Sequence, residues 1–514
     1  KFGSPDVMVR IFDGSYKPYQ NVKNNIKDFF RTGVTINNSL SISGGGENTT
    51  YRVSYSNLNA TDVIPKSDLK RNTFTLGVNS QMKKLTIDAK FSYIVEDTNN
   101  RPALGDDSSN LGLSVAALAP NIDQAWLKNY EDENGNYRLW NSNGYRLNPY
   151  FVINENKNET EKNRIMGNFS ASYAITDWLT ATGRAGIDRF NFKGFNFVNA
   201  GTTWPGREKG SLVNNDITFQ EYNTEALLNA QKSIGDFNIS LGVGANQRVS
   251  QRIVTGSTLT NMIIKGENKQ SNFLSSVLNP KTNDEILVRS LYTYLRANYK
   301  NYLFLDFTGR NDWNSTLASA ASSDYNNNYS FFYPSLSSSF IFTDGLNINS
   351  DVLTFGKIRA SWAGTAKALE TPYATALTYN IQAKPLLGNP IGSVNTNIIP
   401  NNTLKPEFTT SYEVGADLGF FKNRIEIDLS YYYTRTKDQL IILNTSQTSG
   451  YTGANANAGT VENKGIEALI KAGIFRNENG FNWDLTFNFA KNKNTLLELT
   501  GDTDTQVVSN ARWA

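Results

Sequence analysis

Apolar and polar positions alternate with a period of two along most of the chain. In the stretch YLFLDFTGR at 302–310, one face of the extended chain carries leucine and phenylalanine, and the other carries charged or hydroxyl groups. The apolar set is Leu303, Leu305 and Phe307, and the polar set is Asp306, Thr308 and Arg310. Such segments follow one another from residue 33 to residue 493, and each can cross a bilayer at a tilt. The pattern predicts about sixteen strands.

The predicted connections alternate between short and long. Short links fall at 81–84, 175–178, 233–236, 299–302, 421–424 and 475–480, and long polar segments at 96–162, 190–217, 250–286, 311–328, 365–407 and 436–461. Outer-membrane barrels have short turns at one end and long loops at the other. Unpaired strand edges are too costly in lipid, so the strands are expected to close. We therefore predict an all-β fold, a transmembrane antiparallel up-and-down β-barrel with long extracellular loops.

Composition leaves a soluble all-β protein open but removes several functions. The 514 residues carry a net charge of +3 with no basic stripe, which argues against a nucleic-acid partner. The chain has no Cys and no His, so disulfides, zinc–thiolate sites and Ser-His-Asp triads are excluded. We expect no enzymatic activity, no cofactor and no metal. No apolar run of about 18 residues exists, which excludes a membrane-spanning helix.

Alternation and position suggest which residues line a lumen or bind substrate. These candidates are Asp306, Arg310, Asp312, Trp313, Arg359, Glu413, Asp417, Glu426 and Asp428. Glu426 and Asp428 share one face of one strand, which favours a polar lining over a glycosidase pair. The loop aromatics Trp126, Trp140 and Trp204 either stack on a ligand or pack one loop against another. The acidic segment 130–141 lacks the calcium-loop spacing and reads as a hairpin turn.

Aromatic residues lie beside the predicted short turns. They are Trp178, Tyr299, Tyr302, Phe420 and Phe421. Tyr and Trp settle where hydrocarbon meets water, so these rings are expected to form a girdle at that membrane surface. The alternative is that they pack a soluble core at hairpin ends.

Several stretches resemble TonB-dependent outer-membrane transporters of the SusC/RagA type. The pieces LKPEFTTSYEVGADLGFFKNRIEIDLSYYYTRTKDQLI at 404–441 and NKGIE at 463–467 are similar to TonB-dependent barrels in general, and FFRTG at 29–33 and GRNDW at 309–313 to the SusC-like branch. The resemblance implies a barrel of about 22 strands in the outer membrane, filled by a plug and driven through TonB. It also implies a SusD-like surface lipoprotein as a lid, import of oligosaccharides or peptides, and possible pairing of barrels.

The resemblance also suggests how the chain is organised. Residues 1–32 are expected to link a plug to the barrel, 33–500 to form the barrel, and 501–514 to begin a further loop or strand of an incomplete chain. The plug that contacts TonB in the family is not expected within this chain. An alternative function stays open: a passive pore, or a structural barrel subunit of an outer-membrane protein-export or surface assembly.

Overall fold

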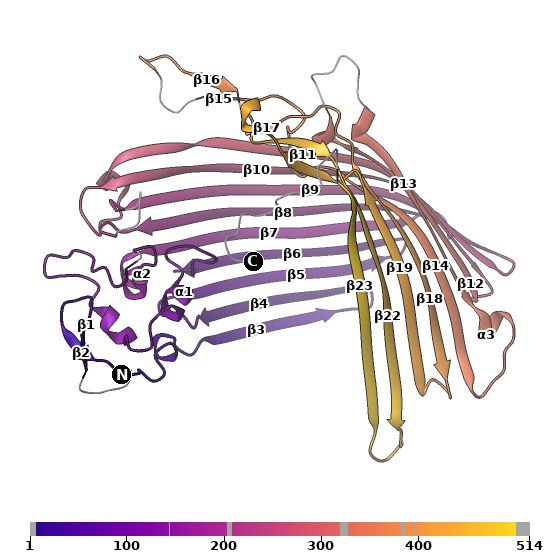
Figure 1. Ribbon diagram of the computed structural model, residues 1–514. Helices are drawn as coiled ribbons and strands as arrows, with labels where there is room; N and C mark the ends of the chain where they lie inside the picture. Colours follow the sequence, from indigo (N-terminus) through magenta and orange to yellow (C-terminus); the bar gives the residue numbers. More distant parts are fainter. Residues whose placement is uncertain are drawn as a thin grey trace.

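A single 16-stranded antiparallel sheet dominates the structure (Figure 1). The computed structural model describes residues 7–142, 144–202, 208–318, 327–381, 386–394 and 397–499. The strands of the large sheet are β3 (Val34–Gly45), β4 (Thr49–Thr61), β5 (Asp68–Met82), β6 (Leu85–Asn99), β7 (Lys157–Ala174), β8 (Leu179–Val198), β9 (Ser211–Ile234), β10 (Phe237–Met262), β11 (Phe273–Tyr299), β12 (Leu303–Asn314), β13 (Ser330–Ile341), β14 (Leu353–Lys367), β18 (Glu407–Phe420), β19 (Ile425–Lys437), β22 (Thr460–Phe475) and β23 (Trp483–Glu498). They are hydrogen-bonded in this order. The predicted all-β, up-and-down arrangement and its strand number are confirmed.

Short and long connections alternate as predicted. Tight links join β5 to β6, β7 to β8, β9 to β10, β11 to β12 and β18 to β19, whereas long segments follow β6, β14 and β19. Two of the predicted loops are wrong in extent, because β8 to β11 take up much of 190–217 and 250–286. Their polar residues continue the ladder: β10 and β11 stay paired from Phe237↔Tyr299 to Met262↔Phe273. Polar side chains alone therefore did not mark the ends of these strands.

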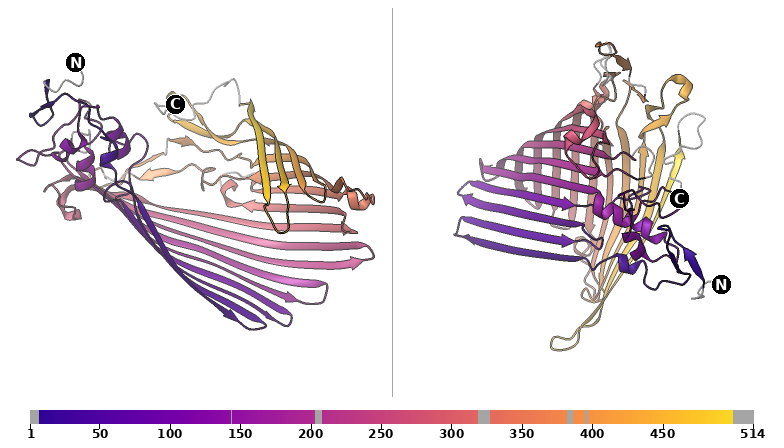
Figure 2. Two further views of the ribbon diagram at one scale, coloured as in Figure 1. Left: turned by 90° about the horizontal axis from the view of Figure 1, so that it is seen from below. Right: turned by 90° about the vertical axis from the view of Figure 1, so that its left-hand side faces the viewer.

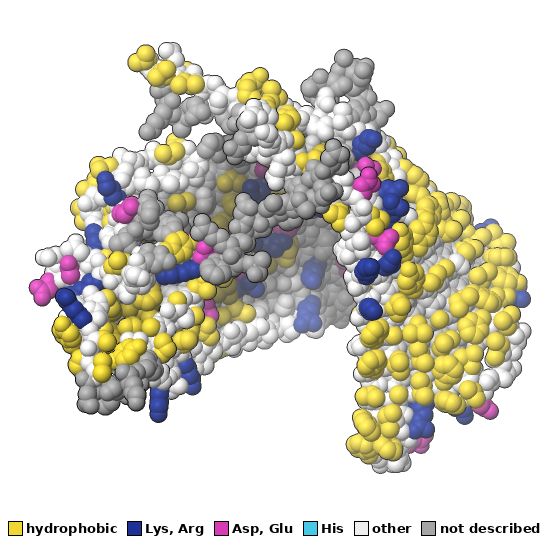
Figure 3. Space-filling view, viewed as in Figure 1, with side chains coloured by type: hydrophobic (Ala, Val, Ile, Leu, Met, Phe, Trp, Pro, Cys, Tyr) yellow, Lys and Arg dark blue, Asp and Glu magenta, His cyan; other side chains and the backbone are white. Residues whose placement is uncertain are grey.

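The sheet is strongly curved (Figure 2). Its two faces differ in chemistry. On the outer, convex face of β10, the apolar side chains Phe237, Leu241 and Val243 are about half exposed. Apolar positions on that face run from Phe237 to Ala245, about the length of a transmembrane strand, and Gln247 follows. Figure 3 shows the same apolar surface on the outer side of the wall at β12 to β23. The opposite, inner face carries the charged residues described below.

Aromatic rings cluster beside the short turns, as the predicted girdle requires. Trp178 is 50% exposed between β7 and β8. Phe237 and Tyr299 face each other across β10 and β11 with ring centroids 4.6 Å apart. Trp483 stacks on Phe475 at 6.1 Å beside the β22–β23 turn. These rings, most of them about half exposed, fit a membrane interface better than a soluble core.

Residues 7–32 and the segment 100–156 pack together at the long-loop end of β3 to β6 (Figure 1). Their elements are β1 (Met8–Arg10), β2 (Tyr16–Pro18), η1 (Lys27–Phe29), α1 (Leu111–Ala116), η2 (Gln124–Lys128) and α2 (Pro149–Glu155). A small core joins Phe29 to Ile64, Leu111, Val115 and Ile153. Asn25 Nδ2 donates to the Ile122 carbonyl at 2.6 Å. The interpretation of 1–32 as a plug-to-barrel link stays a prediction; its described part is part of this loop-end unit.

The remaining elements belong to the loops after β10, β12, β14 and β19, or, for α3, to the connection between β13 and β14. They are η3 (Gln270–Asn272), η4 (Ser315–Leu317), η5 (Asn327–Tyr329), α3 (Phe342–Gly345), β15 (Tyr379–Ile381), β16 (Gly392–Val394), β17 (Ile398–Ile399), β20 (Leu440–Asn444), η6 (Gln447–Ser449) and β21 (Gly453–Asn457). A core of Leu317, Phe331, Ala368 and Leu404 ties these loops to the top of β13.

The large sheet is an open trough in the described part of the chain. β3 pairs only with β4 there, and β23 only with β22. Residues 501–514, predicted to begin a further loop or strand, lie outside the described residues. The helices that the structure describes are all too short or too polar to cross a membrane.

Candidate functional site: the inner face of the trough

Arg359 on β14 is the centre of a charged cluster on the inner face. The register Lys357↔Asp417 and Asp417↔Asp428 sets its neighbours from β18 and β19 on the same face. Arg359 Nη2 donates to Asp428 Oδ1 at 2.7 Å and to Ser430 Oγ at 2.5 Å. Its Nη1 donates to Asp417. One guanidinium thus holds carboxylates from two neighbouring strands, which is the geometry that arginine serves best.

Other charged side chains extend the cluster on both sides. Lys357 Nζ lies 3.0 Å from Asp417 Oδ2, and Glu413 Oε1 lies 3.8 Å from Arg359 Nε. On β22, Lys471 Nζ lies 3.8 Å from Glu426 Oε2. A hollow of about 590 Å³ on the inner face is lined by the charged side chains of this cluster other than Glu413, namely Lys357, Arg359, Asp417, Glu426, Asp428 and Lys471. The predicted candidates Arg359, Glu413, Asp417, Glu426 and Asp428 are therefore brought together.

A glycine makes room for the arginine. A Cβ atom at Gly415 would lie 2.7 Å from both Nε and Cζ of Arg359. Real Cβ contacts are never that short, so the guanidinium plane can lie on the β18 backbone only because residue 415 has no side chain.

A second hollow of about 660 Å³ lies on the inner face between β8 and β14. Tyr292 and Tyr294 of β11 lie flat over glycines of β10, because Cβ atoms at Gly244 and Gly242 would fall 2.3 and 2.2 Å from their rings. Arg296 stacks on Tyr294 at 4.9 Å. The hollow therefore presents tyrosine rings beside cationic groups.

Of the candidates on β12, Arg310 lines this second hollow, and Asp306 and Asp312 contact other residues that line it. Arg310 Nε donates to Asp312 Oδ1 at 2.8 Å, and Tyr333 of β13 donates to Asp312 Oδ2 at 2.8 Å. Asp306 Oδ1 lies 3.2 Å from Arg296 Nε. Asp306, Arg310 and Asp312 thus share one face, as the alternation predicts.

Ion pairs between neighbouring strands continue along the inner face from β5 to β10. They are Arg71–Glu96, Arg164–Asp188, Arg184–Glu225 and Arg248–Glu221. Sequence reasoning missed these pairs and the Tyr–Gly contacts. The alternation places their members on the right face, but only the strand register reveals which residues meet. The inner wall is thus polar and nearly neutral, with each described carboxylate of these pairs held by a cation.

The four tryptophans predicted as candidates do not lie together on the inner face. Trp313 lies in β12 beside Ser330 of β13, and the alternation puts it on the outer face, opposite Asp312. Its prediction as a lumen-lining or loop residue is thus wrong, because the strand runs to Asn314. Trp140 donates from Nε1 to the Arg146 carbonyl at 2.9 Å, and Trp126 lies under Lys17 at 6.0 Å. Trp204 lies outside the described residues.

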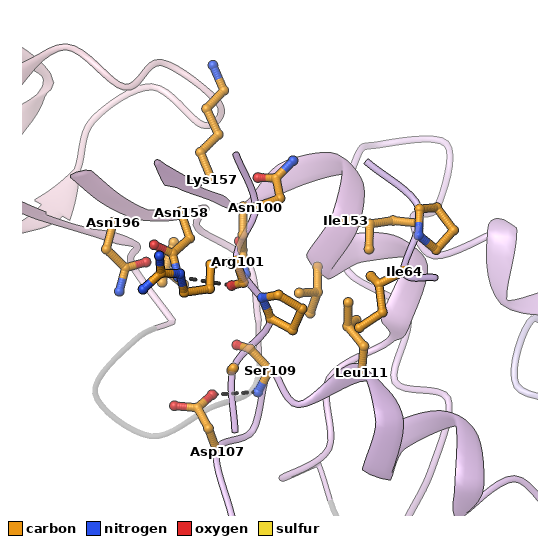
Figure 4. Close-up of a pocket in the computed structure, with 16 residues that line it drawn as sticks. Ile64, Asn100, Arg101, Asp107, Ser109, Leu111, Ile153, Lys157, Asn158 and Asn196 are labelled. Atoms are coloured by element: carbon orange, nitrogen blue, oxygen red, sulfur yellow. Dashed lines mark hydrogen bonds between the residues drawn. The ribbon is translucent and has the colours of Figure 1, made fainter. Parts of the chain in front are cut away.

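The loop-end unit contains a small hollow of about 110 Å³ (Figure 4). Its polar groups hold the loop to the strands: Asn158 Nδ2 donates to the Arg101 carbonyl at 3.1 Å, and Asp107 Oδ1 accepts from the Ser109 amide at 2.7 Å. Nearby, burial first and then the hydrogen bond to Glu155 raise the pKa of Tyr130 to about 12. The predicted hairpin is present, since the Gly135 amide donates to the Asp132 carbonyl at 2.9 Å.

The sheet, its alternating connections and its polar inner face have counterparts among known proteins. A model of the family described as "TonB dependent receptor-like, beta-barrel" matches residues 12–514. The chain belongs to this family. TonB-dependent receptor P3 of Formosa agariphila is 26% identical over 498 residues, which is 93% of this chain and 47% of that receptor. TonB-dependent receptor SusC of Bacteroides thetaiotaomicron is 26% identical over 522 residues, 92% of this chain and 48% of SusC.

The fold of this receptor-like chain is similar to solved structures. The structure titled "RagAB peptide transporter" aligns with a TM-score of 0.77 at 20% identity, covering 93% of this chain and 52% of that one. The ferripyoverdine receptor of Pseudomonas aeruginosa aligns with a TM-score of 0.55 at 12% identity, covering 90% and 55%. The predicted SusC/RagA-type resemblance and outer-membrane location are confirmed.

The similarity covers this chain almost entirely but only part of each relative. The chain spans about half the length of the relatives that it matches. Those relatives are named as receptors and transporters, in keeping with the expectation of a protein that is not an enzyme.

Proposed function

We propose that this chain is part of the wall of a SusC-type importer that takes up bulky nutrients, oligosaccharides or peptides. Energy would come from TonB through a plug, and a SusD-like lipoprotein would close the long-loop end. The observation that supports this proposal most is the inner face, where charged and tyrosine side chains from many strands line two hollows. Such a lining suits a polar solute that must enter and leave.

Several arginines of the inner wall are paired with carboxylates, which favours passage of a solute over its tight binding. Arg359, Arg310 and Arg184 each have a carboxylate partner on the wall. A solute that passes them gains hydrogen bonds without having to neutralise a bare charge. Conduction needs binding that is favourable but weak and spread over many sites. The inner wall, with these arginines paired to carboxylates, meets this requirement.

The length of strands β8 to β11 favours a lipoprotein lid at the long-loop end. β10 has 26 residues, which at about 3.3 Å per residue and a tilt of about 40° rise roughly 65 Å. The apolar band of such barrels is only about 25 Å tall. Much of β8 to β11 therefore projects beyond the membrane on the long-loop side. This tall wall and the packed unit of 7–32 with 100–156 offer a firm base for a protein partner.

The test uses the full-length receptor in its own outer membrane. Cells carrying it are supplied with defined oligosaccharide and peptide mixtures, and uptake is compared with cells that lack TonB or the partner lipoprotein. We expect uptake of one class that stops without TonB. A matched pair of substitutions, Arg359→Met on the inner face and Lys70→Met on the outer face, should alter uptake only for the first.

A bilayer recording separates the importer from the alternative pore. The purified full-length receptor in a planar membrane should carry almost no current when it is not energised. A steady open conductance, with uptake that does not depend on TonB, would instead establish a passive pore and overturn the proposal.

A further inference from the structure

Two lysines face each other on the outer surface of the wall. Lys464 of β22 and Lys493 of β23 are directly paired across the strands, and Lys491 pairs with Ile466 one step nearer the short turn. These positions alternate with the inner-face residues Gly465 and Asn492, so the lysines share the outer face. Like charges directly opposite each other destabilise a sheet.

Elsewhere on the outer face, charged side chains have partners of opposite charge on neighbouring strands. One row runs Lys70, Asp97, Glu161, Lys193 and Asp216 across β5 to β9. Its two adjacent acids are flanked by a lysine on each side. The row that contains Lys464 and Lys493 continues instead into Tyr433. On the strands that the structure describes, the lysine pair therefore has no acidic neighbour along its own row.

Among the described residues, the side chains around this lysine patch leave it positively charged. We define the patch as Lys464, Lys491, Lys493 and Arg435. Glu462 pairs with Lys464 at 2.6 Å. Within the described residues, neither Lys491 nor Lys493 forms an ion pair, and the buried Nε of Arg435 has no hydrogen-bond partner. One carboxylate thus faces a group of cations.

The patch lies at the upper edge of the apolar band. Below it on β23, Leu485, Phe487 and Phe489 are about half exposed on the same outer face. From Trp483 beside the short turn, Lys491 and Lys493 are roughly 20 and 25 Å higher along the membrane normal, using the strand rise and a tilt of about 40°. Figure 3 shows charged side chains nearer the long-loop end and apolar ones below them. This height is the level of the outer headgroups.

We propose that the lysine patch binds the phosphate of a glycolipid headgroup in the outer leaflet. The phosphate would sit between Lys491, Lys493 and Lys464, and the acyl chains would lie on Phe487 and Phe489. An anion at this point removes the repulsion between the paired lysines. The patch would thereby fix a lipid on this part of the wall, whatever solute the protein carries.

The experiment is a lipid titration of the detergent-purified full-length receptor, followed by native mass spectrometry. The probe is lipid A with its phosphates, and the comparison lipid is the same molecule after phosphatase treatment. The variant is Lys491→Gln with Lys493→Gln, and the matched control is Lys70→Gln with Lys193→Gln. At about 1 kcal/mol per lysine, the variant should bind phosphorylated lipid A roughly 30-fold more weakly. The control pair should bind as the native protein does.

Thermal unfolding gives a second measurement, because the substitutions that weaken lipid binding should not lower the stability of the lipid-free protein. Without lipid, the Lys491→Gln, Lys493→Gln variant should melt at or above the native midpoint, because a repulsion has been removed. Phosphorylated lipid A should raise the midpoint of the native protein and not that of the variant. Equal affinity of native and variant protein, or equal binding of the dephosphorylated lipid, would overturn the proposal. Displacement of the lipid by millimolar inorganic phosphate would assign the patch to a free anion instead, and would overturn it too.

Discussion

Replacing Gly415 with alanine tests whether Arg359 is held against the wall as the structure has it. The new Cβ would lie 2.7 Å from the guanidinium Nε and Cζ, whereas ordinary contacts begin near 3.4 Å. The guanidinium must therefore retreat by about 0.7 Å. Its bond to Asp428, now 2.7 Å, would then stretch toward the limit of a hydrogen bond.

The net effect is a difference of two terms. A hydrogen bond to a charged group contributes about 1.5–3 kcal/mol, and losing one at this partly solvated site costs about 2 kcal/mol. Alanine gains back about 0.5–1 kcal/mol because glycine loses more backbone freedom on folding. We expect a net loss of about 1 kcal/mol in the free energy of unfolding.

The assay is guanidinium unfolding of the full-length receptor in phospholipid vesicles, with a matched glycine as control. Gly186 also faces inward, but its Cβ would meet its nearest neighbours at 3.8 Å. Gly186→Ala should therefore be neutral or stabilising. In an Arg359→Ala background, Gly415→Ala should lose its cost as well. If Gly415→Ala were as stable as Gly186→Ala in the native background, the close contact with Arg359 would be refuted.

The remaining predictions concern the outer face, the loop-end unit and the second hollow, which Tyr292 and Tyr294 line. Leu305→Arg on the outer face should cost about 2–4 kcal/mol in vesicle unfolding, whereas Ser337→Arg on the inner face should cost little; equal costs would argue against lipid on one side. Phe29→Ala should leave barrel unfolding unchanged but speed proteolysis of 100–156, because Phe29 is 3% exposed in the small core. Unchanged cleavage would contradict that packing. Gly242→Val should displace Tyr294 and lower barrel stability by about 1–3 kcal/mol, and an unaltered midpoint would count against the Tyr–Gly contact.

The strand count and the two faces could be predicted because both depend on a local pattern. Leu305 and Asp306 fall on opposite faces whatever their partners are, since side chains alternate along any strand. The turn positions followed from breaks in the same pattern. Strand ends were less predictable: β10 continues to Met262 through polar residues because its outer face is in water beyond Ala245.

Partners across the sheet could not be predicted. Arg359 and Asp428 are far apart in sequence and meet only because β14, β18 and β19 are neighbours in a fixed register. A shift of one residue would move Asp428 to the other face. The misplaced Trp313 has a different origin, which is the unpredicted strand end: β12 continues to Asn314, so Trp313 lies in the strand and not in a loop.

Side-chain environment along β12 tests the central claim most directly, namely that this sheet is a membrane wall with a wet inner face. This chain has no Cys, so spin labels can be attached to single cysteines introduced at each position from 303 to 310, after any Cys elsewhere in the full-length receptor has been replaced. In vesicles, labels at Leu303, Leu305 and Phe307 should collide mainly with oxygen dissolved in lipid, and labels at Asp306, Thr308 and Arg310 with a water-soluble nickel complex. A period of two with this phase is the predicted result. Equal access of the nickel complex to both sets would contradict the account.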